Sequence, residues 1–276
     1  ILNSCQRNDV VDLYAGFLNP PAEARPFVRW WWNGNRITEK EIERQIEVLH
    51  SAGIGGVEIN PIAFPEWSDS LGIRSLIWLS PEWNSLLALA SEEAGKKGMI
   101  TDLIVGSGWP FGGEFINEDE SVQRVITNSI KCNGGDRIRE TGESLLHKAL
   151  AAQSRAAEGE AFSDELFFIR LVPEETGNTG VVTDLFSLIG PEGGLDYKVP
   201  AGTYNLVYGI LQKGHRHVQN GAPGAAGPVM DHYRRNITLA YLNRLKKISD
   251  DTGIPLSKLI RALFCDSIEL AGANWS

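Results

Sequence analysis

The chain has 276 residues, of which 42% are hydrophobic and 22% are charged. This composition supplies a large apolar core and excludes an intrinsically disordered chain. The net charge of −9 at pH 7 argues against a nucleic-acid partner, because a phosphate backbone requires a basic surface. With 8 Trp and 29 Gly, the chain suits a neutral, polar ligand that is held by stacking and hydrogen bonds.

The first 25 residues are polar. Within them, Leu2-Asn3-Ser4-Cys5 resembles the end of a bacterial lipoprotein signal, in which the cysteine is lipidated, although the apolar segment of such a signal is absent. Cys5 is therefore either a lipidation site or an incidental residue of a frayed terminus. Lipidation would make the protein extracytoplasmic, as a periplasmic or outer-membrane lipoprotein of a bacterium. No stretch has the roughly 18 apolar residues of a membrane span, so a membrane would be reached only through this anchor.

Regular structure is expected from Phe27 onward. Residues 27–32 are β-prone and run into a turn at 33–35. Thr38 then starts a helix with a capping-box pattern, Gly53 ends it, and residues 57–60 form a second strand.

The same cycle repeats once more. Ser80 caps a helix that ends at Gly98, and a third strand at 100–105 runs into a glycine-rich loop at 106–113. This alternation predicts a parallel sheet with right-handed crossovers, either doubly wound or closed into a barrel. No GxGxxG follows the first strand, whereas aromatic and polar residues gather past the strand ends, which favours the barrel.

A different pattern follows, with strand-like segments such as 167–172 and 204–210 separated by turns. We expect a small β domain inserted after the third strand, in which the Ala-rich stretch 143–157 is a helix or a linker. The α/β pattern then resumes with helices at 231–249 and 256–260 and a buried strand at 262–269.

This pattern predicts an order of parts along the chain. The expected parts are a leader (1–25), the first βα units (26–121), an inserted β domain (122–213), and a continuation of the barrel truncated after its fourth strand (214–276). Four strands cannot close an eight-stranded barrel, so the chain is either a fragment or an open sheet.

Four blocks of sequence, in this order, resemble glycoside hydrolase family 106, the α-L-rhamnosidases. They are Arg25-Pro-Phe-Val-Arg-Trp-Trp-Trp-Asn-Gly-Asn-Arg-Ile-Thr38, Ala52-Gly-Ile-Gly-Gly-Val-Glu58, Gly106-Ser-Gly-Trp-Pro-Phe-Gly-Gly113, and Cys265-Asp-Ser-Ile-Glu269 with Asn274-Trp-Ser276. The resemblance implies an α/β fold, namely about the first four units of a (β/α)8 TIM-type barrel with a β insertion. It also implies calcium dependence and inverting hydrolysis of terminal α-L-rhamnosyl linkages in plant or bacterial polysaccharides. Enzymes of that family are much longer than 276 residues.

Glu269 is the candidate general acid. It follows an apolar strand at the edge where barrel sites are built, and partial desolvation there would suit it to donate a proton. The alternative is a carboxylate on a surface loop. Asp266 falls on the opposite face of a regular strand, so we expect it to contact substrate, orient a neighbour or hold the loop. The second catalytic carboxylate would then lie beyond Ser276, and this chain alone would be inactive.

Candidate sugar-binding residues follow the first strand. Trp30 and Trp32 share one face, and Trp31 takes the other. We expect Trp30 and Trp32 to stack on sugar, with core packing as the alternative. Asn33 and Asn35 lie past the strand end, where they either bond sugar hydroxyls or form the turn.

Three more residues complete the expected site. Glu58 and Asn60 face the same side of the second strand. A charged Glu in an apolar strand indicates a ligand for substrate or Ca²⁺, or else a buried ion pair. Trp109 in the glycine-rich loop suits a flat sugar face, since the loop lacks the Lys-Ser/Thr of a phosphate-binding loop.

Two histidine-containing segments carry weaker signals. His215 and His217 are expected at the surface rather than in a metal site, and Asp231 is expected to cap a helix. The function that these observations predict is a glycoside hydrolase acting on an oligo- or polysaccharide. A non-catalytic carbohydrate-binding protein and a hydrolase of another sugar remain the alternatives.

Overall fold

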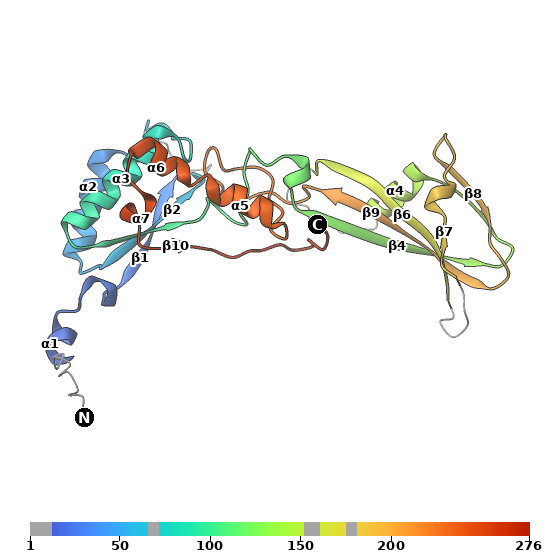
Figure 1. Cartoon of the computed structure of the whole chain (residues 1–276), viewed down its shortest axis with the longest axis horizontal. Coiled ribbons are helices and arrows are strands. Elements are labelled where there is room, and N and C mark those ends of the chain that lie inside the picture. The colour runs from blue at the N-terminus through green and yellow to red at the C-terminus, as the bar shows by residue number, and fades with distance from the viewer. Residues whose placement is uncertain (1–12, 66–71, 152–160, 175–180) are drawn as a thin grey trace, which may run out of the picture. The chain divides into compact units, whose positions relative to one another are not determined.

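The computed structural model describes residues 13–65, 72–151, 161–174 and 181–276, which belong to two compact units (Figure 1). Unit 1 contains Ile1–Trp109, Gln219–Ala226 and Ala240–Ser267. Unit 2 contains Pro110–Val218, Gly227–Leu239 and Ile268–Ser276. Cys5 lies outside the described residues. Within the described ranges, no helix combines the length and apolar character needed to cross a membrane.

Unit 1 is built on a four-stranded parallel sheet, as the sequence predicts. Its order is β1 (Phe27–Asn33), β2 (Gly56–Ile62), β3 (Ile100–Ile104), β10 (Leu263–Phe264). The order in space is thus the order along the chain.

Helices cover one face of this sheet. They are α2 (Glu39–Ser51), α3 (Pro81–Lys96), α6 (Lys246–Thr252) and α7 (Leu256–Leu259), with a short α1 (Leu13–Leu18) before the first strand. Thr38 Oγ1 accepts from the Glu41 amide and Ser80 Oγ from the Trp83 amide, each at 3.3 Å, which confirms both predicted caps. Ile59 and Leu103 of the sheet are buried, as are Ile42 of α2 and Leu87 of α3.

The last part of unit 1 differs from prediction in two respects. The helix expected over 231–249 is two shorter helices, α5 (Arg235–Asn243), which crosses from unit 2 into unit 1, and α6. The strand expected over 262–269 is only β10, which pairs with β3 at Leu263 and Phe264. Among the described strands, β10 pairs with a neighbour on one side only. Few backbone hydrogen bonds are therefore available to lengthen this strand.

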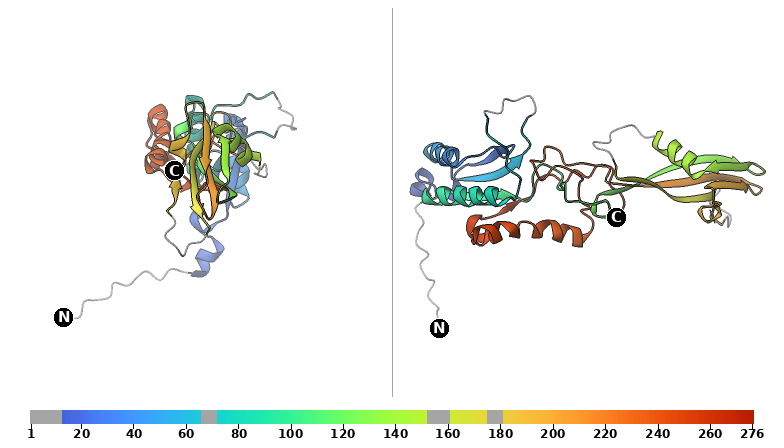
Figure 2. Two further views of the ribbon diagram at one scale, coloured as in Figure 1. Left: turned by 90° about the vertical axis from the view of Figure 1, so that its right-hand side faces the viewer. Right: turned by 90° about the horizontal axis from the view of Figure 1, so that it is seen from above.

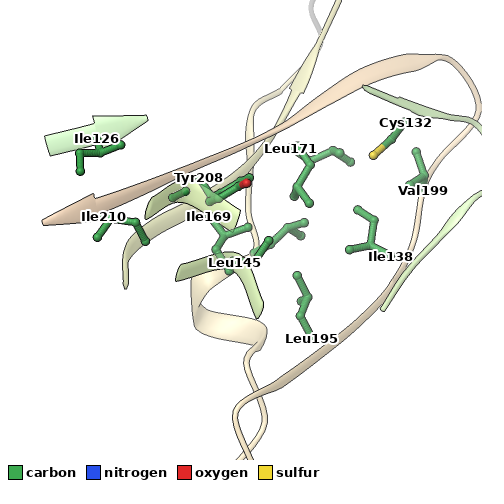
Figure 3. Packing of buried hydrophobic residues seen from close by; sticks show 13 residues of the cluster. Ile126, Cys132, Ile138, Leu145, Ile169, Leu171, Leu195, Val199, Tyr208 and Ile210 are labelled. Carbon is green, nitrogen blue, oxygen red and sulfur yellow. The ribbon is translucent and has the colours of Figure 1, made fainter. Parts of the chain in front are cut away.

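Unit 2 contains an antiparallel sheet in the order β4 (Gln123–Asn133), β9 (Thr203–Lys213), β6 (Ser163–Pro173), β7 (Thr183–Asp184). A separate antiparallel pair is formed by β5 (Arg137–Thr141) and β8 (Gly194–Lys198). The described part of the Ala-rich stretch is in helix α4 (Gly142–Ala151), which lies against one face of the sheet (Figure 2). Between them lies a core that includes Leu145, Ile169, Leu171 and Tyr208 (Figure 3). The opposite face of the sheet is partly open to solvent.

Candidate active site

The uncovered face of the unit 1 sheet is polar. Along β1, Arg29, Trp31 and Asn33 alternate with the helix-facing Trp30 and Trp32. The parallel register places Arg29 beside Glu58 and Trp31 beside Asn60. Because paired residues on adjacent strands point to the same side, these four residues share one face of the sheet.

Arg29 contacts both charged and aromatic side chains on this face. Its Nε lies 3.1 Å from Glu58 Oε1, and its Nη1 donates to Asp266 Oδ2 at 2.9 Å. The guanidinium also lies over the ring of Trp31 at 5.4 Å and over that of Phe264 at 4.7 Å. One arginine therefore holds two carboxylates between two aromatic rings.

These contacts also indicate that the sheet is curved. Phe264 and Asp266 belong to β10 and the residues after it, whereas Arg29 belongs to β1, so the contact links the two outer strands. In a flat sheet, three strand spacings separate them by about 14 Å. Direct contact between their side chains indicates that the polar face is concave.

Glu58 is the carboxyl whose environment is most perturbed on this face. Burial raises its pKa, and the nearby charge of Asp266 adds to the effect, while Arg29 and the Asn60 amide oppose it. Asn60 is itself buried and donates through Nδ2 to Glu58 Oε1. Glu58 thus forms the ion pair that was the predicted alternative, with Arg29 as its partner, but the pair is partly exposed instead of buried. A perturbed carboxyl on a concave polar face is typical of an active-site wall.

Asp266 has both oxygens engaged. Oδ2 accepts from Arg29, and Oδ1 accepts from the Ser267 amide at 2.7 Å. Its contacts match the expected role of holding the loop.

The two tryptophans chosen from the sequence face the helices. Trp30 is 7% exposed and donates through Nε1 to Gln45 Oε1 at 2.5 Å, and Trp32 is 1% exposed and packs edge-to-face on Trp83 at 5.5 Å. Their rings belong to the core, so the polar-face stacking expected of them is corrected. Trp31, at 40% exposure, is the ring on the polar face. Its place two residues after charged Arg29, on the same face of the strand, was the signal in the sequence that could have identified it.

The turn after β1 uses its two asparagines differently. Asn35 is fully buried with a positive φ of 51°, and it donates to Leu76 O at 3.2 Å and accepts from Trp83 Nε1 at 3.1 Å. Because its amide is satisfied inside the protein, Asn35 builds the turn rather than contacting sugar. Asn33 is exposed and lines a cavity of about 440 Å³ beside β1 and α2, together with Trp31 and Arg36.

Trp109 lies within the glycine-rich loop, which hydrogen bonds hold in place. Its backbone pairs in both directions with Gln219, at 3.1 and 2.8 Å, and Ser107 Oγ donates to Pro61 O and accepts from the Ala222 amide. Gly108 has φ +64°, and a Cβ there would lie 2.2 Å from Gln219 O, so glycine is required. Trp109 is half-buried at this loop.

Glu269 lies in unit 2, and its side chain is 48% exposed. Its Oε2 is 3.8 Å from Arg216 Nη2. The strand end expected to carry it is therefore wrong, because β10 ends at Phe264 and Glu269 lies on the segment that follows.

The segment after Glu269 rests on a buried histidine. His215 is 3% exposed, in contrast to the surface position expected for it, and its ring lies against the backbone of Ala271 and Val122. Burial lowers the pKa of His215 to about 4, and the charge of Arg124 adds to that effect. The imidazole is therefore neutral at pH 7.

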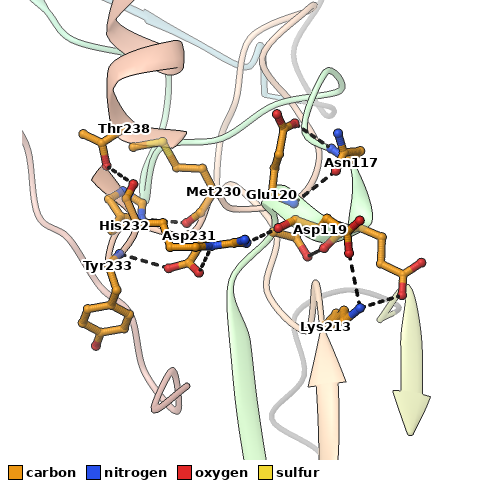
Figure 4. A network of polar contacts seen from close by, with 12 residues as sticks. Asn117, Asp119, Glu120, Lys213, Met230, Asp231, His232, Tyr233 and Thr238 are labelled. Atoms are coloured by element: carbon orange, nitrogen blue, oxygen red, sulfur yellow. Dashed lines mark hydrogen bonds and ion pairs between the residues drawn. The ribbon is translucent and has the colours of Figure 1, made fainter. Parts of the chain in front are cut away.

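Asp231 has a structural role, but it lies in the turn before α5, which begins at Arg235, and does not cap the helix as expected (Figure 4). It is fully buried, its Oδ1 accepts from the Tyr233 amide at 3.0 Å and its Oδ2 from Arg234 Nε at 2.8 Å. Its own amide donates to Glu120 O at 2.8 Å. Asp231 thereby joins the turn before α5 to the Asn117–Glu120 capping box.

The residues of the polar face do not fit a calcium ion. Glu58 and Asp266 already share the guanidinium of Arg29, which would repel a second cation between them. Across the described ranges, no three His, Cys, Asp or Glu side chains gather in a way that could hold a metal.

A comparison with known families decides the assignment. The family model described as alpha-L-rhamnosidase matches residues 18–161, more than half of the chain. The chain belongs to glycoside hydrolase family 106. This confirms the resemblance seen in the sequence.

Two relatives extend over nearly the whole chain. A protein of Formosa agariphila, provisionally named a β-glucuronidase, is 22% identical over 297 aligned residues, which cover 97% of this chain and 25% of that protein. The rhamnosidase from Novosphingobium sp. PP1Y superposes with a TM-score of 0.62 at 17% identity, over 96% of this chain and 40% of that one. The chain thus shares the fold of the rhamnosidase and spans a quarter to two fifths of these relatives' lengths.

Proposed function

We propose that the protein is a glycoside hydrolase that cleaves terminal α-L-rhamnosyl linkages of oligo- or polysaccharides with inversion. In this proposal the 276 residues are the N-terminal part of its catalytic region. The observation that carries it is the concave polar face on which Arg29 joins Glu58 of the second strand to Asp266 beyond the fourth. The family of the chain supplies the reaction class.

The strand order supports a partial (β/α)8 barrel. A doubly wound sheet reverses its strand order at a switch point, whereas a barrel adds each strand beside the last. The order β1-β2-β3-β10 has no reversal, and the side-chain contact between its outer strands favours a sheet that curves toward closure. In a longer protein, further strands would complete the wall of the barrel.

In this mechanism Glu269 is the general acid. As the bond between the anomeric carbon and the glycosidic oxygen breaks, Glu269 gives its proton to that oxygen. Water attacks the anomeric carbon from the opposite face and loses a proton to a second carboxylate, about 6.5–9.5 Å away, which we expect beyond Ser276. Within unit 2, Arg216 Nη2 lies 3.8 Å from Glu269 Oε2.

Trp31 is the residue that we assign to sugar stacking on the polar face. Its ring is 40% exposed there, next to the charged Arg29. The apolar CH groups of a pyranose pack on such a ring, while the neighbouring polar groups bond its hydroxyls.

A substrate panel on the full-length protein tests the proposal. We expect turnover of an aryl α-L-rhamnoside, and NMR at early times should show the product with the anomeric configuration opposite to that of the substrate. A product of the same configuration would rule out inversion. Binding of rhamnosides without any hydrolysis would instead identify a carbohydrate-binding protein.

A second sugar specificity is favoured by one observation. The Formosa relative covers 97% of the chain and bears a β-glucuronidase name. An aryl β-D-glucuronide in the same panel separates the two, since the preferred substrate should have the higher kcat/KM by at least about 10²-fold where the site bonds a group that the other sugar lacks.

We also propose that the protein works outside the cytoplasm, with a lipid on Cys5. The support is the Leu2-Asn3-Ser4-Cys5 sequence. Labelling with a clickable palmitate analogue should mark the full-length wild type and not Cys5→Ser, and the variant should leave the membrane fraction. Equal labelling of both would exclude Cys5.

A further inference from the structure

Arg29 and Glu58 each have one polar atom on the polar face of unit 1 that their mutual contact does not use. The contacts of Glu58 involve Oε1, which lies 3.1 Å from Arg29 Nε and accepts from Asn60 Nδ2. Within the described residues, Oε2 of Glu58 accepts no hydrogen bond, and Nη2 of Arg29 donates none. The two side chains are 18% and 33% exposed, so a ligand can reach these atoms.

The pair lies toward the carboxyl ends of the strands. The register places Arg29 level with Glu58 and Glu58 level with Asp102, whereas the pairing of β10 with β3 ends at Phe264. Asp266, which accepts from Nη1 of Arg29, lies beyond that last pair. The guanidinium therefore reaches toward the end of the sheet at which a barrel has its binding site.

Neighbouring side chains hold both groups in place. Asn60 is buried, and its amide donates to Oε1 of Glu58. The guanidinium donates to Asp266 at 2.9 Å and lies over the rings of Trp31, at 5.4 Å, and Phe264, at 4.7 Å. A carboxylate and a guanidinium that are held in this way lose little side-chain entropy when a ligand binds.

A carboxylate oxygen beside a guanidinium N–H matches two neighbouring hydroxyl groups of a sugar. The carboxylate only accepts hydrogen bonds and the guanidinium only donates them, whereas each hydroxyl does both. Hydrogen bonds to charged groups are also about twice as strong as those between neutral groups. Trp31, whose ring is 40% exposed beside the guanidinium, offers an apolar surface for the CH groups of the same sugar.

We propose that Glu58 and Arg29 together bind two neighbouring hydroxyls of the terminal sugar. One hydroxyl donates to Oε2 of Glu58, and the next accepts from Nη2 of Arg29. This inference rests on the proposed function, which places the terminal sugar on the polar face. Both candidate sugars, rhamnose and glucuronate, carry hydroxyls on their second, third and fourth carbons, so every neighbouring pair includes the hydroxyl on the third carbon.

Substrates with and without that hydroxyl test the site. In the full-length wild type, kcat/KM for an aryl α-L-rhamnoside should be about 10²-fold higher than for the analogue that lacks the hydroxyl on its third carbon. In Glu58→Gln, and in Arg29→Lys, which keeps the cation between the two carboxylates, this ratio should fall below about tenfold. Glu43→Gln, which changes an exposed carboxyl of α2, should keep the wild-type ratio.

The ratio separates recognition from damage to the fold, because partial unfolding lowers kcat/KM for both substrates together. An unchanged ratio in Glu58→Gln, or a wild type that does not distinguish the two substrates, would overturn the proposal.

A binding measurement separates this inference from the proposed function. Titration calorimetry gives the affinity of full-length Glu269→Gln for a trisaccharide capped by α-L-rhamnose, with and without the third-carbon hydroxyl of the cap. The two affinities should differ about 10²-fold, and adding Glu58→Gln should reduce the difference below about tenfold. If the wild type hydrolyses no rhamnoside but this dependence is seen, the reaction is wrong and the hydroxyl site stands. If the trisaccharide does not bind, or if Glu58→Gln leaves the difference unchanged, the hydroxyl site is refuted whatever the activity.

Discussion

Arg29 donates a hydrogen bond of 2.9 Å to Asp266, which lies 237 residues later in the chain. The contact joins the first strand of the unit 1 sheet to the segment that follows its fourth strand, across the intervening β2 and β3. The same guanidinium pairs with Glu58 at 3.1 Å. One side chain therefore links the first strand of the sheet to the second and to the segment after the fourth.

Replacing Arg29 should lower the stability of the protein. Arg29→Met leaves Glu58 and Asp266 as two neighbouring carboxylates without a cation, and we expect a loss of about 1–3 kcal/mol in the free energy of unfolding at pH 7. The loss should shrink toward pH 4, because protonation of Glu58, whose pKa burial already raises, removes the repulsion. Urea unfolding at the two pH values measures it.

The double variant Arg29→Met/Glu58→Gln is the matched control. It should be more stable at pH 7 than Arg29→Met, because the uncompensated charge is gone. Additive effects of the two substitutions would contradict coupling between these residues.

Substitution of Trp32 should lower mainly the stability, whereas substitution of Trp31 should lower mainly the activity. Trp32→Ala removes a buried ring and should cost about 3–5 kcal/mol of stability. Trp31→Ala removes an exposed ring from the polar face, so stability should fall by less than about 1 kcal/mol while kcat/KM for an aryl α-L-rhamnoside falls about tenfold. Equal turnover in Trp31→Ala and the wild type would remove Trp31 from the sugar site.

His215 should make unit 2 sensitive to acid. Its pKa in the folded protein is about 4, below the usual 6.5, so between these values the unfolded state binds more protons. Stability therefore falls as the pH drops from about 6.5 to 4, by roughly 3 kcal/mol in total. A protonated ring would also face the charges of Arg124 and Arg216. Urea unfolding of the wild type and His215→Gln from pH 7 to 4.5 measures the difference in slope, and identical slopes would contradict the buried neutral imidazole.

Asp231 should be the most sensitive carboxylate of the network in Figure 4. Asp231→Ala leaves the Tyr233 amide and Arg234 without their acceptor in a buried place, and should cost about 2–4 kcal/mol. Asp119→Ala removes only a 3.4 Å pair between Lys213 and a mostly exposed side chain, and should cost less than about 1 kcal/mol. Thermal unfolding compares the two variants, and equal shifts would argue against the role of burial.

The sequence predicted what depends on local pattern. Alternating strands and helices gave the parallel sheet, and Thr38 and Ser80 cap their helices as expected, because a cap depends only on the next three residues. The choice of face for Trp30 and Trp32 was wrong, since alternation separates two faces without saying which one the helices cover. The contact between Arg29 and Asp266 joins distant segments, and no local pattern encodes it.

The same limit applies to burial. His215 is buried by Ala271 and Val122, which are remote in sequence, so its neighbours in the chain gave no sign of it. Glu269 was expected at the end of a long strand, but the length of β10 is set by its pairing with β3. Both errors concern residues whose surroundings come from tertiary structure.

The leaving-group dependence of full-length Glu269→Gln tests the central claim most directly. A general acid matters only where the departing oxygen needs a proton, so kcat/KM should fall about 10²–10⁴-fold for a rhamnose-capped oligosaccharide and far less for a dinitrophenyl α-L-rhamnoside. Glu143→Gln, which changes an exposed carboxyl of α4, should leave both values intact. Unchanged turnover of the oligosaccharide by Glu269→Gln, or an equal loss on both substrates, would contradict the role of Glu269 as the acid.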